Sequence, residues 1–331
     1  MIRFATIGTN FVVEWFLKCA AQVEGLQYNG TYSRNIEKAE KFAKEHNGNL
    51  IFGNLEELAK SKDVDAVYIA SPNSLHYEQA RLMIKNKKHV MIEKTITSNL
   101  RELNELCRLA KENNVVIMEA MRSVYSPGFL AIKDAMKKIE PVRRVEFQYC
   151  QYSSRYDKYK NGIIENAFNP SFSNGALMDI GVYCVHPLVK LFGLPDEIKA
   201  TATMLPDSID GQGTITCAYD GMIADISYSK ITNGRLPSQI QGEKGTILIE
   251  DIPNPRKIKI IYNDGYEENI ENISCKDLNL EYEAEEWAEL INRAPSPGCR
   301  FTVCRLFWGL SRPFFRLPGR FGAGARVHGG P

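Results

Sequence analysis

The sequence predicts an α/β protein with an N-terminal doubly wound parallel sheet and a C-terminal α+β domain that carries a large open, mainly antiparallel sheet. Three observations lead to this prediction. The chain has 331 residues, which is enough for about two domains with substantial cores. Residues 1–120 alternate short β-branched runs with amphipathic segments, and from about residue 141 strand-like segments follow one another. We place the domains at residues 1–122 and 123–292.

The first domain is predicted from a regular succession of strands and helices. Strands are expected at residues 2–8, 26–32, 65–70, 88–94 and 115–120, and helices at 11–22, 35–46, 74–86 and 100–114. The helical segments each show one apolar face, whereas the strand segments are short and mostly apolar. Because the connections are short, this alternation predicts a parallel sheet that is covered on both sides.

The second domain is predicted from segments in which polar and apolar residues tend to alternate. They lie at residues 142–153, 197–205, 212–220, 222–230, 235–243, 245–251 and 256–263, and turns rich in Gly, Asn and Asp join them. A period of two is typical of an antiparallel sheet with one exposed face. An apolar helical segment, residues 174–193, interrupts this series.

The composition is that of an ordinary globular protein. Hydrophobic residues make up 44% and charged residues 24%, and a net charge of +1 gives no electrostatic reason to expect nucleic acid or a membrane as a partner. No apolar run reaches the roughly 18 residues of a membrane span, and the N-terminus lacks the pattern of a signal peptide. The eight cysteines are scattered without a CxxC motif. We therefore predict a cytoplasmic protein with neither disulfides nor a metal site.

Residues 293–331 differ in character from the rest of the chain. They hold seven arginines but no lysine and no acidic residue, directly after an amphipathic helical pattern at residues 280–292. An abrupt change of this kind is typical of a frame-shifted or foreign end, and a basic interaction tail is the alternative. We expect poor order there, because the segment has neither a helical nor a strand period.

Gly8 directly follows the first predicted strand and precedes a helix. A helix N-terminus at this point would present N–H groups and a positive dipole end to a pyrophosphate. The dinucleotide pattern G-x-G-x-x-G/A is only partly present, because Gly8, Thr9, Asn10 and Phe11 stand here and Asn10 replaces the second glycine. The loop predicts a dinucleotide site, and a plain strand–turn–helix connection is the alternative.

Ser33 and Arg34 stand at the end of the second predicted strand, where an NAD site would carry an acidic residue for the ribose. A hydroxyl and a guanidinium suit a 2′-phosphate, because Arg can bind phosphate through two N–H groups at once. This pair favours NADP over NAD as the cofactor. The alternative is that Arg34 is a solvated residue that opens the next helix.

Polar residues also follow the next two strands of the predicted sheet. They are Ser71, Pro72, Asn73 and His76 after one strand, and Glu93 and Lys94 after the other. Ligands of open α/β sheets bind at the carboxyl ends of the strands. We therefore predict that these residues contact the cofactor, with Lys94 facing the crevice beside the nicotinamide. For His76 the alternative is a surface position at a helix start.

The apolar segment 174–193 carries Asp179, Tyr183 and His186 at spacings of four and three, which places them on one helical face. An acid, a phenol and an imidazole on one face suggest a site. The alternative is structural, with Asp179 capping the helix, Tyr183 half-buried and His186 engaged in the core. His186, and Arg122 just past the fifth strand, are candidate substrate contacts.

Taken in order, the Gly8 loop and the stretches "SRNIEKAEKFA", "IASPNSLHYEQA", "MIEKT" and "GALMDIGVYCVH" resemble the Gfo/Idh/MocA oxidoreductase family, up to about residue 292. The resemblance implies a Rossmann domain, a nicotinamide between the domains, and a sugar, polyol or cyclic diol as substrate. It implies that Lys94 is the lysine of the family's E-K-P motif. It further implies that Tyr183 is the acid/base of D-x-G-x-Y/H, that Asp179 is the aspartate of that motif, and that two subunits pair through the open sheet.

One departure from the family lies beside the predicted reaction centre. Thr95 replaces the proline of E-K-P, so the Lys94–Thr95 bond is either cis without a proline or trans in a displaced loop. The chemistry does not need that proline. An ammonium near a phenol favours the phenolate, so Lys94 would help Tyr183 take the hydroxyl proton while hydride leaves the carbon. The alternative function is a nucleotide-binding regulator of the same fold without turnover.

Overall fold

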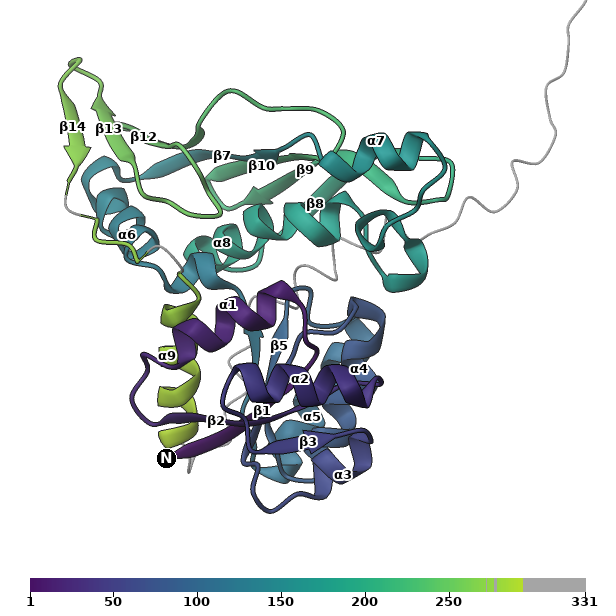
Figure 1. The fold of residues 1–331 in the computed structure, drawn as a ribbon. Helices are drawn as coiled ribbons and strands as arrows, with labels where there is room; N and C mark the ends of the chain where they lie inside the picture. Colours follow the sequence, from purple (N-terminus) through teal and green to yellow (C-terminus); the bar gives the residue numbers. More distant parts are fainter. Residues whose placement is uncertain (272, 277–278, 294–331) are drawn as a thin grey trace, which may run out of the picture.

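The first sheet is parallel and has six strands in the order β3-β2-β1-β4-β5-β6 (Figure 1). The structure is a computed structural model that describes residues 1–271, 273–276 and 279–293, so all but Arg293 of the unusual C-terminal segment lies outside the described residues. The elements of this part are β1 (Ile2–Ile7), α1 (Phe11–Ala20), β2 (Leu26–Tyr32), α2 (Ile36–Glu45), β3 (Leu50–Phe52), α3 (Leu55–Lys60), β4 (Ala66–Ile69), α4 (Asn73–Lys85), β5 (His89–Glu93), α5 (Leu100–Asn113) and β6 (Ile117–Ala120). The predicted doubly wound parallel sheet is confirmed.

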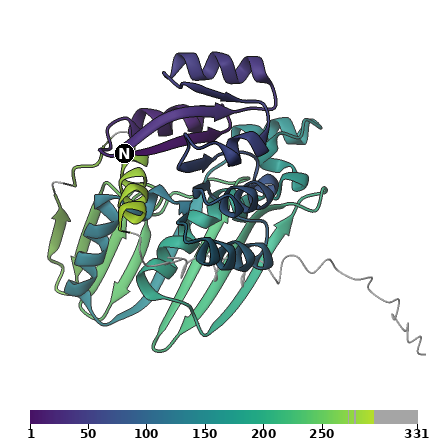
Figure 2. The same cartoon turned by 90° about the horizontal axis from the view of Figure 1, so that it is seen from below.

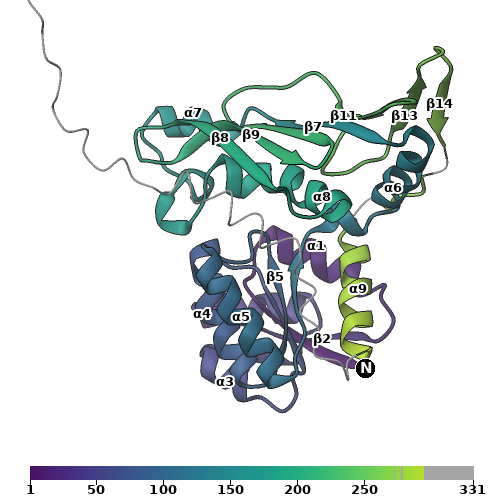
Figure 3. The same cartoon turned by 180° about the vertical axis from the view of Figure 1, so that it is seen from behind.

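Alternate residues of the central strands enter different cores, one on each face of the sheet. In β4, Val67 and Ile69 pack among the residues of α3, α4 and α5, whereas Ala66 and Tyr68 pack among those of α1 and α2. Figure 3 shows α3, α4 and α5 together on one side of the sheet and α1 on the other. All four residues of β4 are apolar and buried because both faces of the sheet are covered there.

Two elements at the edge of the first sheet do not follow from the sequence pattern. The strand β3 has three residues and pairs only with β2, and the helix α3 has six. Segments this short do not complete a period of either secondary structure, so tertiary pairing decides their conformation.

The second sheet has eight strands in the order β14-β13-β12-β11-β7-β10-β9-β8. Its strands are β7 (Val142–Cys150), β8 (Glu197–Met204), β9 (Asp210–Tyr219), β10 (Met222–Ser229), β11 (Ser238–Gly242), β12 (Gly245–Ile249), β13 (Ile258–Tyr262) and β14 (Glu267–Ile270). Within the described residues, the β7–β10 pair is parallel and the other neighbouring pairs of this sheet are antiparallel, so the prediction of a mainly antiparallel sheet is confirmed.

One face of the second sheet packs on α6 (Pro127–Ile139) and α8 (Val182–Phe192), and both helices lie on the side that faces the first sheet (Figures 1 and 3). Val145 and Phe147 of β7 point into that core. Arg144 and Glu146 alternate with these two residues along β7. They lie on the opposite face, where Arg144 pairs with Glu146 at 2.7 Å. Seen from below, the first-sheet unit lies in front of the second sheet (Figure 2).

The helical stretch Pro170–Phe192 is long and apolar enough to cross a membrane by length and composition alone, yet 72% of its most apolar window is buried inside the fold. It contains a π-helical turn, η4 (Leu177–Gly181), that continues directly into α8. Burial between the two sheets therefore accounts for the apolar character of this stretch. π-Helical turns occur frequently at functional sites.

The last described helix, α9 (Leu280–Asn292), returns to the first sheet, where it packs on α1. Trp287 is fully buried there, with its ring centroid 6.0 Å from that of Phe4 and 6.5 Å from that of Phe16. The division at residue 123 that the sequence suggested assigns α9 to the second domain, whereas its side chains complete a core of the first.

Candidate active site

The carboxyl ends of β4 and β5 meet the segment that leads into α8. The Thr95 hydroxyl donates to the Met178 carbonyl at 2.9 Å, and the Asn73 amide donates to the Ser173 carbonyl at 3.2 Å. The Lys94–Thr95 peptide bond is cis. These contacts join the two sheets at the place where ligands of open parallel sheets bind.

Asp179 lies between two lysine ammoniums at this junction. Lys94 Nζ lies 2.9 Å from Asp179 Oδ1 and also 2.9 Å from the Asp179 carbonyl oxygen, whereas Lys230 pairs with Asp179 Oδ2. The side chains of Lys94 and Asp179 are 20% and 28% exposed, and that of Lys230 is 4% exposed. The three groups form a partly buried charge cluster with one net positive charge.

Burial and charge act in opposite directions on these three groups. Burial alone would raise the pKa of Asp179, but the two ammoniums outweigh it and keep that pKa well below its usual range. Burial would lower the pKa of Lys94, yet the Asp179 charge and its neighbours produce a net rise. For Lys230 burial prevails and lowers the pKa, although Asp179 opposes it. At neutral pH the Asp179 carboxylate is therefore ionised.

Tyr183 lies on α8, one turn beyond Asp179, with cations and an aromatic ring around it. Lys94 Nζ is 5.3 Å and Arg122 Cζ is 5.9 Å from the centroid of the Tyr183 ring. The ring of Tyr149, on β7, meets it edge-on with the centroids 5.9 Å apart. The structure thus brings Lys94, Asp179, Tyr183 and Arg122 together, although they come from three different elements and the loop after β5.

Two carboxyl groups lie on the first-sheet side of this site, the half-buried one of Glu93 and the buried one of Glu283. The Tyr68 hydroxyl donates to Glu93, which ends β5, and Glu283 comes from α9 and is 1% exposed. Burial, then the charge of Glu93, raises the pKa of Glu283 well above its usual value, and Arg122 offsets only part of this. Burial also raises the pKa of Glu93.

The loop after β1 has the backbone that a phosphate turn requires. Gly8 has φ +119, and a side-chain Cβ there would lie 2.9 Å from the Ala70 carbonyl oxygen, so only glycine fits. Asn10 caps α1, since its Oδ1 accepts from the N–H groups of Val12 and Val13 at 3.0 and 3.2 Å. The asparagine that replaces the second glycine therefore engages two of the helix N–H groups itself.

The remaining residues of the predicted cofactor site are accessible at the edges of β1 and β2. Phe11 is 52% exposed and meets Trp15 edge-on, and Thr9 is partly exposed. Ser33 Oγ accepts from the Asn35 N–H at 3.2 Å, and Arg34 is exposed beside it. The carboxyl ends of β1 and β2 therefore present the Gly8 turn, the Ser33 hydroxyl and the Arg34 guanidinium along one edge of the first sheet.

The structure supports neither prediction for His76, which were a cofactor contact and a surface position at a helix start. It is fully buried, with Nδ1 3.0 Å from the Thr95 carbonyl oxygen and Nε2 2.8 Å from that of Ser71, and burial lowers its pKa despite these two contacts. It therefore ties the loop after β4 to the loop after β5, and neither ring nitrogen faces outward. Ser71 donates its hydroxyl to Gln79 at 2.6 Å, and Pro72 precedes α4.

His186 is not brought to Tyr183. It is 7% exposed, and its Nε2 lies 3.7 Å from Glu119 Oε2, a residue of β6. Burial lowers the pKa of His186 to about 3, so the imidazole is neutral. The expected substrate contact is replaced by the structural alternative.

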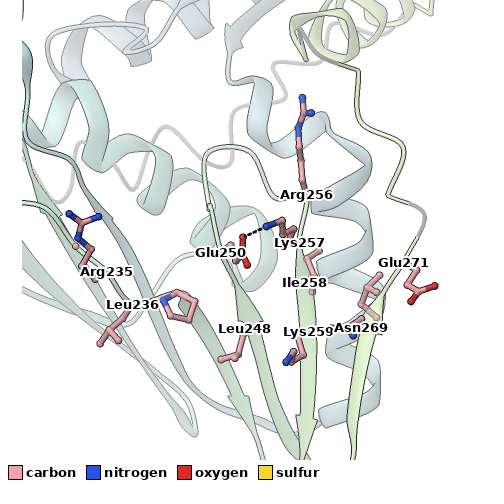
Figure 4. Close-up of a pocket in the computed structure, with 13 residues that line it drawn as sticks. Arg235, Leu236, Leu248, Glu250, Arg256, Lys257, Ile258, Lys259, Asn269 and Glu271 are labelled. Carbon is pink, nitrogen blue, oxygen red and sulfur yellow. Dashed lines mark ion pairs between the residues drawn. The ribbon is translucent and has the colours of Figure 1, made fainter.

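Two hollows in the surface are relevant to ligand binding. One, of about 380 Å³, opens beside Asp179 and Lys230 and is lined further by Gln151, Tyr152 and Arg155. A larger one, of about 840 Å³, lies on the outer side of β12, β13 and β14 and contains none of the predicted site residues (Figure 4). Its rim carries a Glu250–Lys257 ion pair at 3.1 Å.

Three groups in the site do not emerge from the sequence pattern: Lys230, Glu283 and Tyr149. The sequence signal that could have identified Lys230 is its position, since it is a cationic residue directly after the buried strand β10. Glu283 lies in a helix with many acidic residues, and nothing in the spacing separates it from the exposed ones.

The strand order with a glycine turn after β1 is that of dinucleotide-binding sheets, and the site lies between this sheet and a second domain. This is the arrangement of a nucleotide-dependent oxidoreductase. The chain belongs to the Gfo/Idh/MocA family: residues 2–121 match its oxidoreductase domain with an NAD-binding Rossmann fold, and residues 133–248 match the GFO/IDH/MocA C-terminal domain.

Similar proteins agree with this family. The scyllo-inositol 2-dehydrogenase (NADP(+)) IolU of Bacillus subtilis is 48% identical over 88% of both chains. A trans-1,2-dihydrobenzene-1,2-diol dehydrogenase of Xenopus tropicalis is 30% identical over 68% of both. The solved structure of KijD10, a 3-ketoreductase from Actinomadura kijaniata in complex with TDP-benzene and NADP, superposes with a TM-score of 0.77 over 93% of both chains at 19% identity, which shows the shared fold.

The buried acid Glu283 generates a prediction about stability and pH. Because its pKa is raised in the folded protein, the folded state binds more protons than the unfolded chain above pH 4.5, and its contribution to stability falls as the pH rises. We expect Glu283→Gln to raise the unfolding free energy by about 1 kcal/mol or more at pH 8 and by much less at pH 4. Urea unfolding at both pH values measures this difference.

The matched control for this variant is Glu40→Gln on the exposed side of α2. It makes the same chemical change without burial and should leave stability nearly unchanged at both pH values. Equal stability differences for Glu283→Gln at pH 4 and pH 8 would contradict the raised pKa.

Proposed function

We propose that this protein is an NADP-dependent oxidoreductase that transfers a hydride between the nicotinamide and a secondary alcohol or carbonyl of a sugar, polyol or cyclic diol. In this proposal Tyr183 is the acid/base and Lys94 assists it. The observation that carries the proposal is the Lys94 ammonium, which Asp179 fixes 5.3 Å from the centre of the Tyr183 ring at the junction of the two sheets.

The proton follows a short path in this proposal. When alcohol is oxidised, the Tyr183 oxygen takes the hydroxyl proton, and in the reverse direction it returns a proton to the new alkoxide. Lys94 places a positive charge beside Tyr183, where it stabilises the negative charge that develops on the substrate oxygen during the transfer. A lysine has three N–H donors, and two from Lys94 point to Asp179, which leaves the third for Tyr183 or the substrate oxygen.

Asp179 does not act as the base in this proposal. The two ammoniums keep its pKa well below the usual range, so the carboxylate has little tendency to take a proton near neutral pH. Its role is to fix Lys94 through a charge-assisted contact.

The nicotinamide supplies the redox chemistry, since its ring accepts and releases hydride. The glycine turn at Gly8 and the partly exposed N-terminus of α1 fit a pyrophosphate. Ser33 and the exposed Arg34 suit a 2′-phosphate, and the NADP(+) in the name of the Bacillus subtilis relative supports the same choice.

Two observations support the proposed substrate class. The named substrates of the two relatives are a cyclic polyol and a cyclic diol. The hollow beside Asp179 and Lys230 is lined by amide, hydroxyl, phenol and guanidinium groups, which can hydrogen-bond several substrate hydroxyls. A cytoplasmic location, as the scattered reduced cysteines suggest, belongs to the same proposal.

The outer face of the second sheet is proposed as the surface that pairs two subunits. It carries exposed polar side chains and the larger hollow of Figure 4, whereas α6 and α8 cover the opposite face. We expect a molar mass near twice that of the 37.4 kDa chain in light scattering, and a mass that falls when Gln239→Arg and Gln241→Arg are introduced together on that face. A monomer at all concentrations would contradict the pairing.

The central test of the function is turnover, measured by the absorbance of the reduced nicotinamide with NADP and a panel of inositols, sugars and cyclic diols. We expect Tyr183→Phe to lower kcat by roughly 10²- to 10⁴-fold, because it removes the proton acceptor and keeps the ring. Binding of NADPH, measured by its fluorescence, should change little.

Tyr266→Phe is the matched control, since Tyr266 is 62% exposed in the turn between β13 and β14 and does not line the hollow beside Asp179. It should keep most of the kcat. If the unmodified protein binds the cofactor tightly and reduces it with none of these alcohols, the regulator hypothesis is favoured and the enzymatic proposal fails.

The choice of cofactor depends on Arg34. We expect Arg34→Ala to weaken NADP binding by roughly tenfold or more while NAD binding changes by less than about twofold, because only NADP carries the 2′-phosphate. Titration calorimetry with both nucleotides measures the two affinities. Lys44→Ala, at the far end of α2, should affect neither, and equal losses for both nucleotides with Arg34→Ala would rule out the 2′-phosphate contact.

A further inference from the structure

Lys230 is a buried cation that the mechanism above leaves without a role. It follows the last residue of β10, its side chain is 4% exposed, and its ammonium pairs with Asp179 Oδ2. Its other neighbours are the Phe168 ring, whose centroid is 4.8 Å from Nζ, and the Ala167 carbonyl oxygen at 3.5 Å. A buried ammonium is costly unless it is paired, and Asp179 provides the pairing charge.

The contact with Lys230 restricts how Asp179 can turn. Oδ1 of Asp179 accepts from Lys94 and Oδ2 accepts from Lys230, so each carboxylate oxygen has its own cation. Rotation of the carboxylate would break both contacts at once. The direction in which the Lys94 ammonium points therefore depends on a residue from the second sheet that does not touch Lys94.

The contact also sets the charge of the cluster. Lys94 and Asp179 alone would form a neutral pair, and a neutral pair stabilises a phenolate or an alkoxide less than a cation does. With Lys230 the cluster has two positive charges and one negative. The net positive charge is then available on the side of Lys94 that faces Tyr183.

We propose that Lys230 is a positioning residue for hydride transfer. Its ammonium holds the Asp179 carboxylate through Oδ2, the oxygen that Lys94 does not contact. The held carboxylate keeps the Lys94 ammonium oriented, and the second ammonium leaves the cluster with a net positive charge beside Tyr183. The proposal rests on the proposed function, in which Lys94 assists Tyr183. Lys230 itself does not need to touch the reacting oxygen for this role.

Several other groups contribute to the field around Asp179 and Lys230. Charged or titratable side chains from the packed elements are Lys94 after β5, Tyr149 on β7, Arg155 on α7 (Ser154–Lys160), Tyr183 on α8 and Asp210 on β9. All of them remain in a Lys230 variant, so a change that follows its substitution reports the loss of that one ammonium.

The test compares a variant that removes the charge, Lys230→Met, with one that keeps it, Lys230→Arg. Two quantities are measured: kcat and KM for the best alcohol substrate over a range of pH, and the titration of the Asp179 carboxyl by ¹³C NMR of protein labelled at aspartate Cγ. Asp179→Asn identifies the Asp179 resonance. Lys230→Gln, which keeps an N–H donor but no charge, replaces Lys230→Met if the methionine protein does not fold.

We expect the neutral variants to lower kcat by roughly tenfold or more with a smaller effect on KM, and to raise the titration midpoint of Asp179 by about one pH unit or more. Lys230→Arg should keep both values close to those of the unmodified protein. NADPH affinity should be the same in all variants, because Lys230 lies on the second-sheet side of the site.

Three results would overturn the inference. An unchanged Asp179 titration in a folded neutral variant would mean that the contact is not formed. A shifted titration with unchanged kcat would mean that Lys230 only stabilises the fold. If the unmodified protein turns over no alcohol, the proposed function fails first and the role in hydride transfer fails with it, whereas the NMR titration still reports the contact separately.

Discussion

The carboxylate of Asp179 between two ammoniums is the interaction on which the site depends. It joins the end of β5 in the first sheet, the turn before α8 and the end of β10 in the second sheet. None of these segments is adjacent in sequence, so the site exists only when both sheets are in contact. Hydrogen bonds from Asn73 and Thr95 to the same region keep the junction in register, and they do so without using the charged groups.

The site has opposite electrostatic character on its two sides. Toward the second sheet there is an excess of positive charge, because Lys94 and Lys230 outnumber the Asp179 carboxylate that they share. Toward the first sheet the half-buried carboxyl of Glu93 and the buried carboxyl of Glu283 have raised pKa values because loss of solvation disfavours their charge. Arg122 lies between the two sides, with its Nη1 donating to Asn279 Oδ1 at 3.1 Å at the start of α9. The phenol of Tyr183 is therefore placed on the positive side of this boundary.

Periodicity in the sequence predicts most of this fold, because continuous apolar runs and amphipathic segments report burial directly. The strand ends were predictable for the same reason, and Lys94 was found from its position after β5. Asp179 and Tyr183 were found from their spacing on one helical face and from the family resemblance. His76 and His186 were predicted to contact ligands, but both are buried in the structure. The spacing of residues in the sequence shows which side chains share one face of a helix. Whether that face is exposed to solvent depends on the elements that pack around the helix. Lys230 and Glu283 were missed because their partners are distant in sequence.

The placement of α9 has a consequence for how the protein is made. Phe4 leaves the ribosome well before Trp287, which packs on it and follows about 280 residues later in the chain. The nucleotide-binding half thus presents an uncovered apolar flank throughout synthesis of the other half. Domains of a growing chain generally fold in order from the N-terminus, but here the first one closes last. Chaperones that bind exposed apolar surface can bind this flank until α9 has been made.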